Sequence, residues 1–244
     1  MKLVVVMRQT ENWDQLNADK YWSSSKDRRF WCFTGQDLCY RDMLLENMSR
    51  WNLLRMDFFE YRHALKEIVS KILLKEPIGL GDAIKMKGKD IVFLPIDDDD
   101  LVKPGLFEVL QEKFQDPSVE AVTWKTWCCS LMGGRETYFV EPNSTAVRTP
   151  SNCYAIRGDV ANHKLLINHL VFADAPLNKV NLEEEWGLRF LHPAGMYASQ
   201  RRNTLHQMFP FKRTDVPPQL NWAKGVIDEV VGMTSNLSPI KMML

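Results

Sequence analysis

Two continuous apolar runs stand out against several segments whose apolar positions are spaced as in helices. The runs Leu3–Met7 and Ile91–Ile96 show no polar alternation, which is typical of strands that are covered on both faces. Apolar positions recur at helical spacing in five other segments, which are residues 37–51, 60–74, 106–114, 158–170 and 219–231. The pattern predicts an α/β domain in which helices cover a central sheet.

Short strands dominate the middle of the chain. Residues 119–129 and 137–141 flank the pair Gly133-Gly134, which predicts a hairpin or the antiparallel part of a mixed sheet. Residues 152–157 form another short strand-like segment. No repeat and no long linker rich in glycine, serine or proline divides the chain, so we expect a single domain.

Composition narrows the class of protein. The 244 residues carry 31 basic and 31 acidic side chains, so no bulk charge draws the chain to nucleic acid. The five cysteines lack metal-binding spacing, which favours a reduced, cytoplasmic protein. No stretch reaches the roughly 20 apolar residues of a membrane-spanning helix. The sequence is compatible with peripheral attachment to a membrane.

Four consecutive aspartates, Asp97 to Asp100, follow the second apolar run and give the best indication of function. Carboxylates held together repel one another, so their place at the end of a buried strand predicts a bound cation. Side chains alternate along an extended chain, so Asp97 and Asp99 can project together, with Asp100 in support. Such a pair offers oxygen ligands to Mn²⁺ or Mg²⁺ and leaves coordination positions open for phosphate oxygens.

Polar residues also follow the first apolar run. Ligands of open α/β sheets collect at the carboxyl ends of the strands, which makes Arg8, Gln9 and Thr10 candidate ligand contacts. An exposed loop without such a role is an equally good interpretation of these three residues.

The segment from Asp82 to Val102 resembles the GT-A glycosyltransferases, most closely their family-2-like and putative rhamnosyltransferase branches. In these enzymes a helix and a polar turn lead into an apolar strand and an Asp-x-Asp-Asp metal motif. The resemblance implies that Asp97 and Asp98 lie near the nucleotide, and that Asp99 binds the metal bridging the diphosphate. Asp57 is the nearest substitute for an aspartate that the family carries on its second strand.

A second similarity to the same family lies downstream. The layout Glu184-Glu185-Trp186-Gly187-Leu188-Arg189 is similar to the acidic pair, leucine and arginine around the family's general base. The resemblance implies that Glu185 is the base, beside Glu184, and Asp174 is the alternative carboxylate. A positioned carboxylate also suits the deprotonation of an acceptor hydroxyl on chemical grounds. An exposed acidic helix start is the competing interpretation.

Further ligands are expected toward the end of the chain. Many members of the family use a late histidine on the metal or the phosphates, and His192 and His206 lie in the corresponding part. Either histidine is also compatible with an ordinary packed or surface position. Arg201, next to Arg202, could hold the diphosphate because guanidinium groups match phosphate oxygens.

Together these features imply one GT-A domain with a mostly parallel central sheet, helices on both of its faces and a small antiparallel part. Residues 1–120 would bind the nucleotide sugar, and residues 121–244 would form the acceptor side and the C-terminal helix. The implied activity is metal-dependent, inverting transfer of a sugar from a nucleoside diphosphate to a hydroxyl acceptor on a glycan or lipid-linked glycan. Two alternatives are a nucleotidyl or phosphoryl transfer enzyme with paired metals, and a calcium- or sugar-binding module without activity.

Overall fold

A computed structural model describes residues 1–10, 28–34, 78–97, 100–133, 136–140, 153–167, 169–191 and 215–235. The strands are β1 (Lys2–Thr10), β2 (Arg28–Thr34), β3 (Ile78–Gly79), β4 (Ile91–Asp97), β5 (Asp100–Val102), β6 (Ala121–Gly133), β7 (Glu136–Val140), β8 (Tyr154–Arg157) and β9 (Lys179–Leu191). The helices are α4 (Leu80–Lys85), α5 (Leu106–Lys113), α6 (His163–Ile167), α7 (His169–Asp174), the 3₁₀ helix η3 (Pro218–Ala223) and α9 (Lys224–Ser235).

All of these strands belong to one mixed sheet, curled toward a half-barrel, with the order β3-β2-β1-β4-β8-β6-β9-β5 and β7 paired to β6. Only two of its eight pairings are parallel, namely β1 with β4 and β6 with β9. The prediction of a mostly parallel GT-A sheet is therefore wrong. The described helices are also few and short.

Strands β8 and β5 explain why the prediction of a mostly parallel sheet was wrong. Strand β8 lies between β4 and β6 and runs antiparallel to both, while β5 adds an antiparallel edge strand beside β9. An unbroken apolar run reports that both faces of a strand are covered, but it carries no information on the direction of the strand's neighbours.

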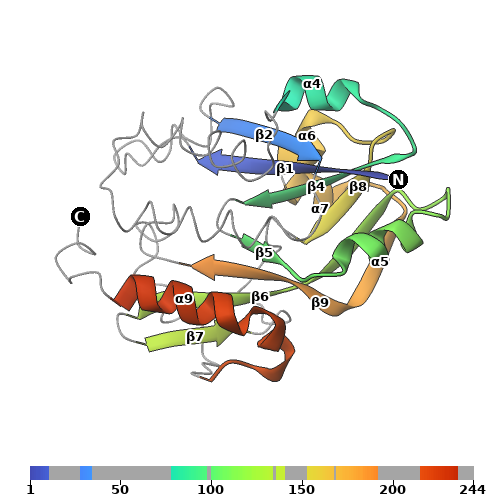
Figure 1. Cartoon of the computed structure of the whole chain (residues 1–244). Coiled ribbons are helices and arrows are strands. Elements are labelled where there is room, and N and C mark those ends of the chain that lie inside the picture. The colour runs from blue at the N-terminus through green and yellow to red at the C-terminus, as the bar shows by residue number, and fades with distance from the viewer. Residues whose placement is uncertain are drawn as a thin grey trace.

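Four strands nevertheless run in the same direction. Strand β1 is parallel to β4, β8 is antiparallel to both β4 and β6, and β6 is parallel to β9. The carboxyl ends of β1, β4, β6 and β9 therefore point to one edge of the sheet. Figure 1 shows the arrowheads of β1, β4 and β9 on that side. We call this edge the carboxyl edge.

Two hydrophobic clusters cover the two faces of β1 and β4. Leu3 and Val5 join one cluster, and the alternate residues Val4 and Val6 join the other, as the pleat of a strand requires. Residues of α5, η3 and α9 pack in the first cluster, and residues of α4, α6 and α7 pack in the second. The prediction that Leu3–Met7 and Ile91–Ile96 lie in strands is confirmed, and residues 3–6 and 91–96 are buried.

Other predicted elements have mixed outcomes. The predicted hairpin around Gly133 is present as β6 and β7. The predicted loop at Arg8–Thr10 is wrong because β1 continues to Thr10 and pairs there with β2. The two helices predicted over residues 37–51 and 60–74 lie outside the described residues.

The helix predicted from Gly158 begins only at His163. The Gly158 amide donates to the carbonyl of Ile91 at 2.8 Å, so this residue extends the contact between β8 and β4 instead of starting a helix. Of the described helices, none is long and apolar enough to cross a membrane.

Candidate functional site

The aspartate tetrad lies at the carboxyl edge. Asp97 is the last residue of β4 and Asp100 is the first residue of β5, so only two residues connect these strands. Those two, Asp98 and Asp99, lie outside the described residues. Strand β5 then runs away from the carboxyl edge along β9.

Asp100 faces the protein interior. The residue as a whole is 3% exposed, and the other two residues of β5 are buried as well. Arg189 of β9, itself half-buried, is its register partner in the antiparallel pair. Side chains directly opposite one another in such a pair lie on the same face and interact. Asp100, the last residue of the tetrad, thus begins β5 as a buried acidic residue in register with an arginine.

Asp97, at the other end of the tetrad, also has an arginine as its register partner. Arg8 of β1 is the register partner of Asp97 of β4 in a parallel pair. Two arginines, far apart in the sequence, are thus in register with the first and the last aspartate of the tetrad. Gln9 and Thr10 continue β1 at the same edge. The structure therefore brings Arg8, Gln9 and Thr10 to the tetrad, as strand residues instead of loop residues.

A buried thiol lies close to the pair of Asp100 and Arg189. Burial raises the pKa of Cys153 to about 12, and the two charged groups act on it in opposite directions. The Arg189 guanidinium lowers the pKa of the thiol and the Asp100 carboxylate raises it. Cys153 is protonated at neutral pH, which makes it a packing residue and a poor nucleophile.

The acidic pair Glu184-Glu185 lies in strand β9, so the competing interpretation as a helix start is wrong. The Glu184 carboxylate is 3.7 Å from the Lys103 ammonium, which also lies 4.7 Å from the centre of the Trp186 ring. Glu185 is half-buried and in register with Lys125 of β6, next to irregularities in the pairing of β6 and β9.

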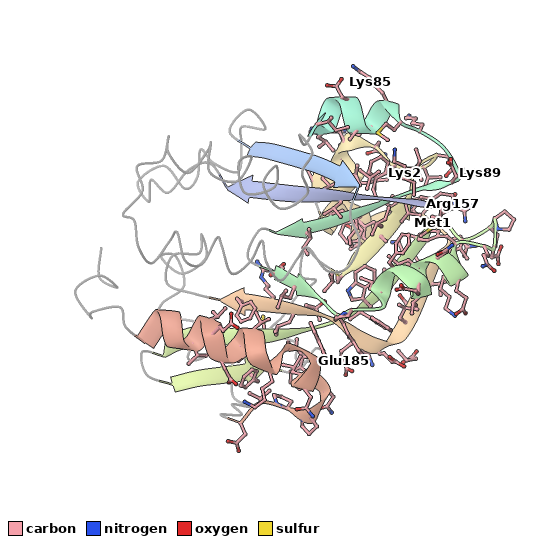
Figure 2. All side chains as sticks on the ribbon, viewed as in Figure 1. Met1, Lys2, Lys85, Lys89, Arg157 and Glu185 are labelled. Carbon is pink, nitrogen blue, oxygen red and sulfur yellow. The ribbon has the colours of Figure 1, made fainter. Side chains whose placement is uncertain are left out.

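This pair does not converge with the tetrad. Strand β9 passes Glu185 four residues before it reaches Arg189, which corresponds to about 13 Å along an extended strand. Figure 2 shows Glu185 well behind the arrowhead of β9. Asp174 is farther away, exposed at the end of α7 and ahead of the start of β9. Glu184 and Glu185 thus lie apart from Asp97 and Asp100, the described ends of the tetrad.

The remaining predicted site residues are Asp57, His192, His206, Arg201 and Arg202, and they lie outside the described residues. His192 directly follows Leu191, the last residue of β9. Among the described side chains, no three from His, Cys, Asp and Glu are grouped closely enough to hold a metal ion.

Sequence reasoning missed the relationship between Arg189 and Asp100. Arg189 was visible only as the arginine that follows the acidic pair, without a role of its own. Its antiparallel partner is fixed by the register of β5 on β9, and no local pattern encodes that register. One sequence signal for such a partner was the place of Asp100 directly before the apolar residues Leu101 and Val102. An acidic residue at the start of a buried apolar segment needs a polar or charged partner.

Comparison with models of known protein families gives no match, and comparison with curated proteins gives no significantly similar sequence.

Proposed function

We propose that this chain is a metal-dependent glycosyltransferase that moves a sugar from a nucleoside-diphosphate sugar to a hydroxyl acceptor. The observation that carries the proposal is the arrangement at the carboxyl edge. Aspartates end β4 and begin β5 there, and arginines of β1 and β9 are in register with these two residues. In open α/β sheets ligands bind beyond the carboxyl ends of parallel strands, and β1 and β4 form such a parallel pair.

The chemistry of a diphosphate donor suits this edge. Asp97 and Asp99 would hold Mn²⁺ or Mg²⁺, which would neutralise the charge of a departing diphosphate. Arg8 at the end of β1 would contact the same phosphates, because a guanidinium group matches phosphate oxygens in shape and charge. Gln9 and Thr10 follow Arg8 at the same end of β1.

The acceptor side is less well supported. The resemblance implies Glu185 as the general base, but the position of this residue on β9 does not favour that role. An acceptor activated at Glu185 would have to reach across about 13 Å of strand to the tetrad. Glu185 as the base stays a prediction, and the same holds for Glu184 and Asp174.

Thermal unfolding with Mn²⁺ and a panel of uridine, guanosine, adenosine, cytidine and thymidine diphosphates tests the donor site. Ligand at a hundredfold excess over its dissociation constant adds about 2.7 kcal/mol, or roughly 5–10 °C for a chain of this size. We expect such a shift with at least one nucleotide, only when metal is present, and its loss in Asp99→Asn. Asp90→Asn is the control, because Asp90 is exposed at the opposite end of β4.

Product analysis then identifies the reaction. Incubation with nucleotide sugars and Mn²⁺ should release the nucleoside diphosphate. Release of pyrophosphate or phosphate would assign nucleotidyl or phosphoryl transfer instead. Tight Ca²⁺ binding without any nucleotide-dependent shift would make the protein a binding module, and the proposal would be abandoned.

A further inference from the structure

We draw no further inference here: the strongest candidate, the patch of three exposed lysines over residues 85–89 on the turn between α4 and β4, carries none, because the exposed carboxylates of Asp82 and Asp90 offset two of its three positive charges and nothing in the structure shows what would cover it.

Discussion

Gly187 of β9 packs so closely against Thr126 of β6 that a side chain at position 187 would clash with Thr126. The two are register partners, and a Cβ atom added to Gly187 would lie nearest to Oγ1 of Thr126, with Cγ2 at 2.9 Å and Cβ at 3.1 Å. Thr126 is 3% exposed and has little room to move. Arg189, the register partner of Asp100, follows two residues later on the same strand.

Gly187→Ala should therefore destabilise the protein. Overpacking a buried site costs about 1–3 kcal/mol of the free energy of unfolding. Urea denaturation measures the loss. The double variant Gly187→Ala with Thr126→Ala removes the two atoms nearest to the added methyl group, so we expect it to be more stable than Gly187→Ala alone. A Gly187→Ala variant as stable as the wild type would show that β6 and β9 can move apart at no cost.

Arg157 of β8 fastens the turn that follows α5. Its side chain, 2% exposed as a residue, donates to the carbonyl oxygens of Asp116 at 2.6 Å and Pro117 at 2.8 Å. Its guanidinium carbon lies 5.6 Å from the centre of the Phe114 ring, a distance at which a cation and an aromatic face attract each other. The side chain thereby ties the α5–β6 connection to the end of β8.

Arg157→Met should lower the free energy of unfolding by about 1.5–3 kcal/mol, the range for a hydrogen bond made by a charged group. Chemical denaturation checks this value. Arg157→Lys keeps a charge but cannot reach two carbonyls with a planar fork, so its stability should fall between those of the wild type and Arg157→Met. Equal losses in the two variants would show that the planar fork, and not the charge alone, provides the stabilisation.

Asp116 should make a small, pH-dependent contribution to stability. The amide and hydroxyl of Ser118 donate to its carboxylate at 2.8 and 2.7 Å, and these bonds lower the pKa of Asp116. Because the folded pKa is lower than the unfolded one, the carboxylate stabilises the fold above about pH 4. This contribution is lost as the pH falls through the folded pKa.

Asp116→Asn should be less stable than the wild type at pH 7, and the difference should shrink as the pH falls from about 4 through the lowered pKa of the folded state. Thermal unfolding across this pH range measures it. Ser118→Ala serves as the control background, because it removes the hydroxyl donor to the carboxylate. We expect Asp116→Asn to cost less stability in the Ser118→Ala protein than in the wild type. A difference that stays constant with pH would exclude the carboxylate as its source.

The sequence by itself determined the elements whose signals are local. The unbroken apolar runs specify β1 and β4 because both faces of these strands need cover, and alternate residues of β1 do join opposite clusters. Helical spacing identified α5 and α9, and Gly133 identified the hairpin. The position of Asp97 at the carboxyl end of β4 also followed from the sequence.

Only the tertiary structure decided strand direction and the partners of the tetrad. Residue periodicity reports which faces of a strand are covered, and pairing is set by contacts between segments far apart in the chain. Because β8 pairs antiparallel with β4, the sheet is mixed. The register of β5 on β9 placed Arg189 opposite Asp100. The same register left Glu185 about 13 Å along the strand, away from the carboxylates it was expected to join.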